Sequence, residues 1–435
     1  MKPLKIRPCR KLRGTVILPG DKSISHRAAI LAALSPGRTL IRHFQFSEDC
    51  LTTLSALKSL GVRIKKNPAK GEVSLVSKGR LASADGILNM GESGTSARVL
   101  MGILAGQPFL SELTGAPSLS RRPMARVIAP LRRMGALIRA RTKDRQLFLP
   151  VRIFPSSLRG ISWQQQVASA QVKSAILFAG LFAEGKTRVL ESARVSRDHT
   201  ERMLKFFGAN IRFGRGQAEI QGGPLRSPGL MDIPGDISSA AFFIVAALLL
   251  PGSRILLKRV GVNPTRMGAV RVLQRMGGQI RLKNKKNGYE PVADLEVLAS
   301  PLRGCRIPCG EVASLIDELP VLMVAAVLAR GKTVIEGIEE LRVKETDRIH
   351  SMTWNLLRAG GTVSVKRSGK REDIHIQGSG RLQAGHFKSF GDHRTAMSMF
   401  VAALTGQKDS VLDDISCARK SFPEFLSVFE HLLVR

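Results

Sequence analysis

The chain has 435 residues, of which 43% are hydrophobic and 23% are charged. This composition excludes a disordered chain, and five cysteines in this length exclude a disulfide-held scaffold. The formal net charge of +34 predicts an anionic partner or substrate. No run of about eighteen uncharged apolar residues occurs, so no transmembrane helix is predicted.

In chain order, the first predicted elements are a strand over 15–18 and an apolar helix over 28–34, joined by the motif Pro19-Gly-Asp-Lys-Ser-Ile-Ser. A related order returns 215 residues later, where Pro234-Gly-Asp-Ile-Ser-Ser-Ala leads into an apolar helix over 240–250. The offset is close to half the chain. Self-similarity at this spacing predicts a duplicated protein with two lobes.

A finer repeat lies within each half. Six Ala-rich apolar runs each end at a glycine, at intervals of 67 to 79 residues, which predicts six units of about 70 residues. The runs cover residues 28–34, 99–105, 174–183, 240–250, 319–329 and 396–404. A helix that is apolar on nearly every side is buried, so helices are expected at the heart of each lobe, with sheets outside. A second helix in each unit mixes apolar and basic positions and should be half exposed.

Polar residues gather at the starts of these helices. Ser, Thr and Asp there suit N-caps, and Pro123 suits a first helical turn. Lys and Arg at the same places oppose the helix dipole, which predicts that the helix starts bind an anion such as phosphate or carboxylate. These cations are Lys22, Arg27, Arg98, Arg122, Lys173, Arg197, Lys344, Arg348, Arg394 and Lys420.

Three carboxylates lie within this basic set, namely Asp317, Glu345 and Asp392. They are candidates for proton transfer, and they are equally candidates for ion pairs with the neighbouring cations. No Walker A loop, Gly-x-Ser-x-Gly elbow or metal-ligand spacing stands out, so no metal and no cofactor are expected.

Taken together, these motifs resemble the 5-enolpyruvylshikimate-3-phosphate synthase family of enolpyruvyl transferases over the whole chain. The resemblance rests on Pro19–Arg27, Gly94-Thr95 with Arg98, Arg122-Pro123, Ser169–Ser174, Arg342–Arg348, Asp392–Arg394 and Lys420–Pro423. It implies an α/β fold of two lobes, each with three βαβαββ repeats whose buried parallel helices are covered by outer sheets, an inside-out α/β barrel. It places the first lobe at 20–235 and the second at 1–19 with 236–435, with crossings near 19–20 and 234–236.

The resemblance also implies the reaction and the site. The enolpyruvyl group of phosphoenolpyruvate would pass to the 5-hydroxyl of shikimate-3-phosphate, with Asp317, Glu345 and Lys22 as catalytic residues and His393 as a further proton-handling candidate. Shikimate-3-phosphate would bind Lys22, Ser23, Arg27, Ser169, Gln171, Arg197, Asp317 and Lys344. Phosphoenolpyruvate would bind Lys22, Gly94, Thr95, Arg122, Gln171, Arg348, Arg394 and Lys420.

Some positions depart from the family pattern. Glu92 and Glu340 stand where the family often has Asn, and a carboxylate at Glu92 is unfavourable beside a phosphate site, so Glu92 is left out of it. Arg197 follows one subset of the family. Gly94 stands where an alanine is associated with glyphosate insensitivity, which makes sensitivity the expectation here.

Two alternatives remain. The related enolpyruvyl transferase that acts on UDP-N-acetylglucosamine uses a cysteine in the loop at 114–123, and this chain has none there. A basic nucleic-acid-binding protein would explain the net charge better, but aromatic residues are not interleaved with the basic ones, so nucleic acid is not expected as a specific partner. We expect a cytoplasmic monomer that binds small molecules and no membrane.

Overall fold

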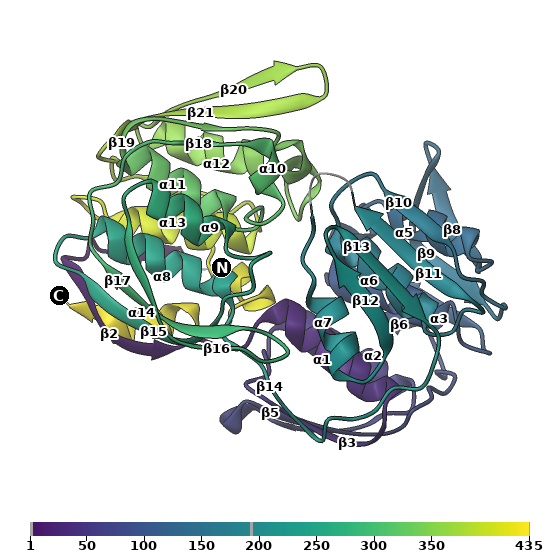
Figure 1. The fold of residues 1–435 in the computed structure, drawn as a ribbon. Coiled ribbons are helices and arrows are strands. Elements are labelled where there is room, and N and C mark those ends of the chain that lie inside the picture. The colour runs from purple at the N-terminus through teal and green to yellow at the C-terminus, as the bar shows by residue number, and fades with distance from the viewer. Residues whose placement is uncertain (1–2, 192–194, 435) are drawn as a thin grey trace. The chain divides into compact units, whose positions relative to one another are not determined.

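The computed structural model describes residues 3–191 and 195–434. They form two compact units, one of Met1–Pro19 with Pro234–Arg435 and the other of Gly20–Ile233 (Figure 1). Gly20, where the second unit begins, has no room for a side chain. A Cβ there would lie 1.8 Å from the backbone oxygen of His43, so only glycine allows this close approach.

The Gly20–Ile233 unit alternates helices and strands. Its helices are α1 (Lys22–Leu34), α2 (Glu48–Ser59), α3 (Gly94–Leu104), α4 (Pro117–Ser120), α5 (Ala125–Arg133), α6 (Ala170–Gly180) and α7 (His199–Phe206), with a 3₁₀ turn at Pro68–Lys70. Its strands are β3 (Pro36–Arg42), β4 (Arg63–Asn67), β5 (Glu72–Lys78), β6 (Leu88–Asn89), β7 (Ser111–Thr114), β8 (Leu137–Lys143), β9 (Gln146–Phe154), β10 (Ser162–Gln165), β11 (Lys186–Glu191), β12 (Asn210–Gly214), β13 (Gln217–Gln221) and β14 (Leu230–Asp232).

The other unit repeats the pattern. Its helices are α8 (Ile237–Leu249), α9 (Gly268–Arg275), α10 (Cys309–Val312), α11 (Leu319–Leu328), α12 (Arg348–Arg358), α13 (His393–Leu404) and α14 (Phe425–Leu432), with 3₁₀ turns at Glu339–Val343 and Ser416–Lys420. Its strands are β1 (Leu4–Ile6), β2 (Lys11–Ile17), β15 (Arg254–Gly261), β16 (Gln279–Lys286), β17 (Val292–Leu298), β18 (Arg306–Ile307), β19 (Arg330–Ile335), β20 (Thr362–Ser368), β21 (Arg371–Ser379), β22 (His386–Phe387), β23 (Ser410–Leu412) and β24 (Leu433–Val434).

The described residues form six sheets, three in each unit. In the sheet β6-β7-β9-β8, the first two strands are parallel and the other pairs are antiparallel. The sheets β10-β11-β13-β12, β14-β3-β5-β4 and β18-β19-β21-β20 repeat this order, and β16-β17-β15-β2-β24 contains it with β24 added. Only β1-β23-β22 is shorter. This regularity confirms the βαβαββ repeat that the resemblance implies, and the last repeat has fewer strands.

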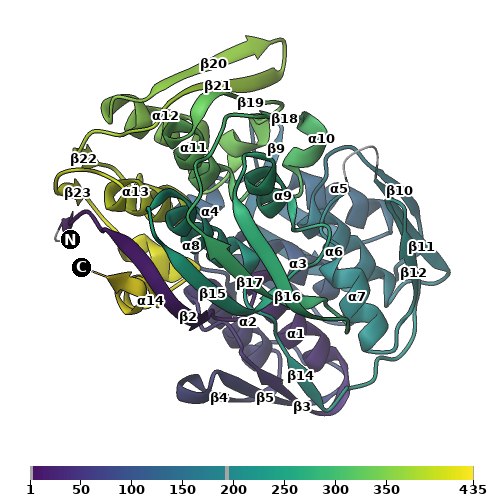
Figure 2. The ribbon, with the colours of Figure 1, turned by 60° about the vertical axis from the view of Figure 1, so that its left-hand side comes forward.

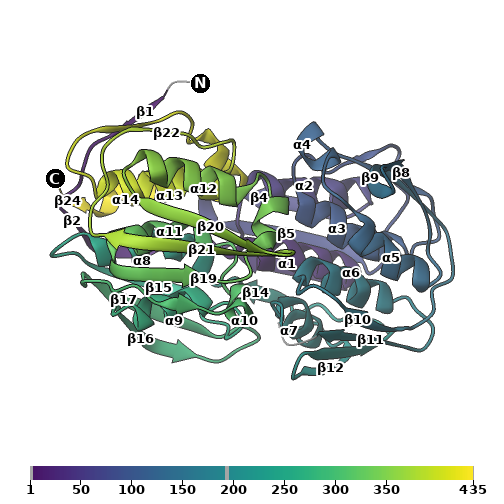
Figure 3. The same cartoon turned by 90° about the horizontal axis from the view of Figure 1, so that it is seen from above.

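The six predicted apolar helices are the buried ones. Nearly every residue of α8 and α11 is buried, as are most residues of α1, α3, α6 and α13. In one unit α8, α11 and α13 contact one another (Figure 2), and β19 and β21 pack against α11 from outside (Figure 3). The core therefore consists of helices that no longer need a polar face, because sheets shield them from water.

Helix starts follow local capping chemistry. Within residues 3–191 and 195–434, five of the six buried helices begin at a Ser or Asp whose side chain accepts a backbone N–H of the first turn. These residues are Asp21, Ser93, Ser169, Asp236 and Asp392. The sequence left two interpretations open for the polar residues at helix starts, namely helix capping and anion binding. The structure confirms capping at these five positions.

The expectation for Pro123 was wrong. Helix α5 begins at Ala125 with Met124 as its N-cap, so Pro123 lies before the helix and not in its first turn. The reason is tertiary: the N–H of Met124 donates to the backbone oxygen of Leu147 at 2.8 Å, which holds this segment on strand β9. Pro123 contributes its carbonyl, which accepts from Arg98 Nη2 at 3.4 Å.

A phenylalanine cluster joins α14 to α8 and α13. The rings of Phe243 and Phe429 stack with centroids 4.2 Å apart, and Phe400, Phe422 and Phe425 pack around them. Phe429 is fully buried. Aromatic pairs of this kind stabilise beyond the area that they bury.

We expect Phe429→Ala to lower the free energy of unfolding of this unit by about 3–5 kcal/mol, because it leaves a cavity beside three rings, those of Phe243, Phe400 and Phe425. Denaturant unfolding measures the change. Ile87→Ala is the control, since Ile87 is 58% exposed and its loss should change stability by less than about 0.5 kcal/mol. Equal effects of the two substitutions would contradict this account of the cluster.

Candidate active site

In the Gly20–Ile233 unit, Lys22 is the first residue of α1. Its Nζ lies 2.8 Å from Oδ2 of Asp49, in the first turn of α2, and both side chains are largely buried. The cation that opposes the dipole of α1 is thus compensated by a carboxylate of the same unit. Sequence reasoning missed Asp49, because an acidic residue in the first turn of a helix is ordinary and carries no sign of a distant partner.

Arg27 lies one turn after Lys22 and is buried among protein oxygens. Its Nη1 donates to the backbone oxygen of Ser23 at 2.9 Å, its Nη2 to Ser174 Oγ at 2.7 Å and its Nε to Thr200 Oγ1 at 2.7 Å. The guanidinium therefore ties α1 to α6 and α7. The structure thus places Ser23 beside Arg27, together with Ser174 and Thr200, which were not among the predicted ligand-binding residues.

Five residues that the sequence singled out meet at the starts of α3 and α6. Gln171 Nε2 donates to Thr95 Oγ1 at 2.9 Å, and Arg98 Nη1 donates to Gln171 Oε1 at 2.9 Å. A Cβ on Gly94 would lie 2.9 Å from Nη1 of both Arg98 and Arg122. Two guanidinium groups thus crowd the N-terminus of an eleven-residue helix, an arrangement that suits an anion.

Glu92, the residue that departs from the family pattern, contacts α4. Its Oε1 accepts a hydrogen bond from Ser118 Oγ at 2.8 Å, and the residue is exposed. This hydroxyl gives the carboxylate a partner outside the set of Gly94, Thr95 and Gln171.

Ser169 and Arg197 lie just before the helices α6 and α7 of this unit. Ser169 is the N-cap of α6, and its Oγ accepts from the N–H of Val172 at 3.5 Å. Arg197 lies in the segment between β11 and α7 and is partly buried.

In the other unit, the three candidate carboxylates all lie close to one guanidinium group, that of Arg348. Arg348 Nε lies 2.9 Å from Asp392 Oδ2, its Nη1 lies 3.4 Å from Asp317 Oδ1, and its Nη2 lies 2.5 Å from Glu345 Oε2. Lys344 Nζ lies 3.8 Å from the same oxygen of Asp317. The two interpretations of these acids, proton transfer and ion pairing, are thus compatible, because the ion pairs with Arg348 hold Asp317 and Glu345 close together.

The electrostatics of this cluster follow from burial and charge. Arg348 is only 1% exposed, and burial alone would lower its pKa. The carboxylates of Asp392, Glu345 and Asp317 more than offset burial, so the pKa of Arg348 is raised and the guanidinium stays charged.

Arg394, His393 and Lys420 lie around the start of α13. Asp392 caps this helix by accepting from the N–H of Arg394 at 2.7 Å. The side chain of Arg394 donates from Nη1 to the backbone oxygen of Ser238 at 3.3 Å, and Lys420 Nζ donates to that of Gly391 at 3.3 Å. His393 is buried as the first residue of α13. Asp392, which accepts from both the helix start and Arg348, has a structural role.

A second buried group lies under the starts of α8 and α11. Arg266 Nη2 lies 3.6 Å from both Asp236 Oδ1 and Glu318 Oε1, and the Ser238 hydroxyl donates to Glu318. The sequence indicated Asp236, Ser238 and Glu318 as polar residues at helix starts, but it did not indicate Arg266. Glu318 directly follows Asp317, so this group anchors the backbone next to a predicted catalytic residue.

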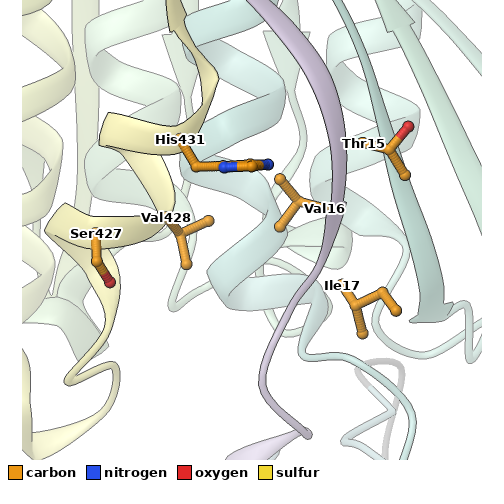
Figure 4. A pocket seen from close by; sticks show the side chains of 6 residues that line it. All are labelled: Thr15, Val16, Ile17, Ser427, Val428 and His431. Carbon is orange, nitrogen blue, oxygen red and sulfur yellow. The ribbon is translucent and has the colours of Figure 1, made fainter.

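A hollow of about 260 Å³ lies elsewhere in this unit, between β2 and α14 (Figure 4). It is lined by Thr15, Val16, Ile17, Ser427, Val428 and His431. It shares no residue with the predicted site, and no Lys or Arg lines it, so it does not suit a dianionic ligand.

Comparisons with known proteins agree on one family. The family model described as EPSP synthase (3-phosphoshikimate 1-carboxyvinyltransferase) matches residues 6–429. The 3-phosphoshikimate 1-carboxyvinyltransferase of Geobacter metallireducens is 45% identical over 436 residues, which cover 100% of each chain. The solved EPSP synthase of Acinetobacter baumannii is 39% identical with a TM-score of 0.88, covering 100% of this chain and 98% of that one. The enolpyruvyl transferase NikO of Streptomyces tendae shares the fold, with a TM-score of 0.75 at 16% identity and coverage of 99% and 97%.

Proposed function

This chain belongs to the EPSP synthase (3-phosphoshikimate 1-carboxyvinyltransferase) family, and we propose from this premise that it transfers the enolpyruvyl group of phosphoenolpyruvate to the 5-hydroxyl of shikimate-3-phosphate, with release of phosphate. Each substrate carries a phosphate and a carboxylate. The concentration of Arg and Lys at helix starts provides the matching positive charge.

The observation that carries the proposal is the position of Asp317 and Glu345 on one guanidinium, that of Arg348. The reaction needs one group to accept a proton and another to donate one, and two carboxylates held together can divide these roles. Asp317 accepts the proton of the 5-hydroxyl. Glu345 donates a proton to the methylene carbon of phosphoenolpyruvate.

Protonation of the methylene carbon leaves a cationic carbon that the 5-hydroxyl oxygen attacks. The C–O bond that forms gives a tetrahedral adduct. Glu345, left as a carboxylate by the first step, removes a proton from the methyl group, which restores the C=C bond. The C–O bond to phosphate breaks with its electron pair on the leaving phosphate, and the proton held by Asp317 passes to that phosphate. Lys22 and His393 are further candidates for moving these protons, and the charge of Arg348, Arg394 and Lys420 stabilises the phosphate as it leaves.

We propose a set of binding residues for each ligand. For shikimate-3-phosphate they are Lys22, Ser23, Arg27, Ser169, Gln171, Arg197, Asp317 and Lys344. For phosphoenolpyruvate they are Lys22, Gly94, Thr95, Arg122, Gln171, Arg348, Arg394 and Lys420. The hydrogen bonds among Gln171, Thr95 and Arg98 support the assignment, because they hold these polar groups in place before any ligand arrives.

The test is phosphate release by the purified protein with shikimate-3-phosphate and phosphoenolpyruvate, each omitted in turn. We expect release only when both are present. Release from phosphoenolpyruvate alone would indicate a hydrolase, and no release from folded protein would contradict the proposal.

We expect Gly94→Ala to raise KM for phosphoenolpyruvate several-fold, because the added Cβ would lie 2.9 Å from guanidinium nitrogens of Arg98 and Arg122 and displace them. By resemblance, the same change should weaken inhibition by glyphosate. Steady-state kinetics with both ligands measures both effects. An unchanged KM, or a wild-type inhibition curve that stays flat to millimolar glyphosate, would contradict this account of Gly94.

We also propose a cellular location and an oligomeric state for the protein. No helix in the described part of the chain has the length and apolar character needed to cross a membrane. The proposed substrates are small, highly charged metabolites, and we place the enzyme in the cytoplasm as a monomer.

A further inference from the structure

A buried ion cluster in the Gly20–Ile233 unit lies outside the residues assigned to the substrates. Lys173 Nζ lies 2.7 Å from Glu191 Oε2 and 2.7 Å from Glu201 Oε1, and each of the three side chains is only 3% exposed. Lys173 comes from α6, Glu191 ends β11 and Glu201 belongs to α7. The cluster thus joins three elements of one repeat.

The cluster is electrostatically unusual because one cation faces two carboxylates. Burial alone would lower the pKa of Lys173, but Glu201 and Glu191 raise it, so the ammonium group stays charged. Burial raises the pKa of Glu201 against the opposing effect of Lys173. Replacing buried ion pairs by apolar side chains is often neutral or stabilising, so stability alone is a weak explanation for this one.

Two contacts connect the cluster to Ser196. The N–H of Ser196 donates to Glu191 Oε1 at 3.0 Å, and Lys173 Nζ donates to the backbone oxygen of Ser196 at 3.4 Å. Both the N–H and the C=O of Ser196 therefore form hydrogen bonds with the cluster. Arg197 is the next residue, so the cluster determines the direction in which the chain presents it.

A further contact connects the cluster to the start of α6. Gln165 Nε2 donates to Glu191 Oε1 at 3.3 Å and to the backbone oxygen of Ser169 at 3.2 Å. Glu191 is therefore the shared member, joined to Lys173, to Ser196 and, through Gln165, to Ser169.

We propose that Glu191 and Lys173 are positioning residues for shikimate-3-phosphate, which hold Arg197 and the Ser169–Gln171 helix start at the separation that this ligand requires. This inference rests on the proposed function, because it uses the assignment of Ser169, Gln171 and Arg197 to that ligand. Glu191 and Lys173 act through these residues and do not touch the ligand.

The experiment compares two substitutions of the same kind within the cluster. Glu191→Gln keeps the shape but offers one acceptor oxygen, which cannot serve both Lys173 and the Ser196 N–H. Glu201→Gln is the matched control, since Glu201 also pairs with Lys173 but has no contact with Ser196 among the described residues. KM for each substrate, kcat and the melting temperature are measured for both variants and wild type.

We expect Glu191→Gln to raise KM for shikimate-3-phosphate about tenfold or more while KM for phosphoenolpyruvate changes less than about threefold. Glu201→Gln should change neither KM by more than about threefold, whatever its melting temperature. Equal effects of the two variants on KM for shikimate-3-phosphate would overturn the inference, because a cluster that only stabilises the fold does not distinguish them.

If Glu191→Gln does not fold, the experiment uses Glu191→Asp. The shorter carboxylate cannot span Lys173 and Ser196, so this variant should also raise KM for shikimate-3-phosphate. Wild-type protein without activity on the two substrates would overturn the proposed function and this inference together. Active wild type with an unselective Glu191 variant would overturn the inference alone.

Discussion

Glu345→Gln should lower kcat by about 10²–10⁴-fold and leave KM for shikimate-3-phosphate within about threefold of wild type. Glutamine has the same shape as glutamate and retains an oxygen that can accept from Arg348 Nη2, so the local geometry should persist. It cannot donate the proton that the methylene carbon of phosphoenolpyruvate requires. A loss confined to kcat is the signature of an interaction made in the transition state.

Glu340→Gln is the control for this prediction. Glu340 lies in the 3₁₀ turn Glu339–Val343 that precedes Lys344, and the proposed chemistry does not use it. The same substitution there should leave kcat within about twofold. An unchanged kcat in Glu345→Gln would remove Glu345 from the proton-transfer role and move the search for the donor to Lys22 and His393.

Arg348→Met should destabilise its unit by about 3–5 kcal/mol and abolish turnover. Methionine matches much of the volume of the arginine but leaves Asp392, which is fully buried, without its charged partner. Asp317 and Glu345 lose the same partner, so the two proposed catalytic carboxylates would repel each other more strongly. Denaturant unfolding and phosphate release measure the two effects.

Arg306→Met is the matched control in the same unit. Arg306 also pairs with a carboxylate, that of Glu336 at 2.5 Å, but its side chain is 74% exposed. An exposed pair contributes about 0–1 kcal/mol, so this variant should stay close to wild type in stability and activity. If the two variants had the same stability, the buried cluster around Arg348 could not be what holds the carboxylates in place.

The helical core was predictable because its signals are local. The apolar runs at 240–250 and 319–329 have almost no polar face, and they form α8 and α11 within three residues of the expected bounds. Asp21 and Asp236 cap their helices through N–H groups two or three residues away, as the pattern predicts. The repeat of these signals predicted six units, and the structure has six sheets in its described part. The βαβαββ order was implied by the family resemblance, and five of these sheets contain it.

The candidate site was predictable as a set of residue types but not as a set of contacts. Lys22 and Arg348 were selected because positive charge at a helix start opposes the helix dipole, and the family resemblance added Gln171. The same motifs did not indicate Asp49, which pairs with Lys22. They also left open whether the acids near Arg348 are ion-paired.

The sequence by itself therefore determined which segments are buried helices, how often the unit repeats and which helix starts carry charge. Only the tertiary structure decided which charges neutralise one another: Lys22 with Asp49, Lys173 with Glu191 and Glu201, and Arg348 with three carboxylates. The physical reason is range. A cap or an apolar face depends on neighbours within a turn or two, whereas Arg348 and Asp392 are 44 residues apart and meet only because α12 and the buried helix α13 begin side by side.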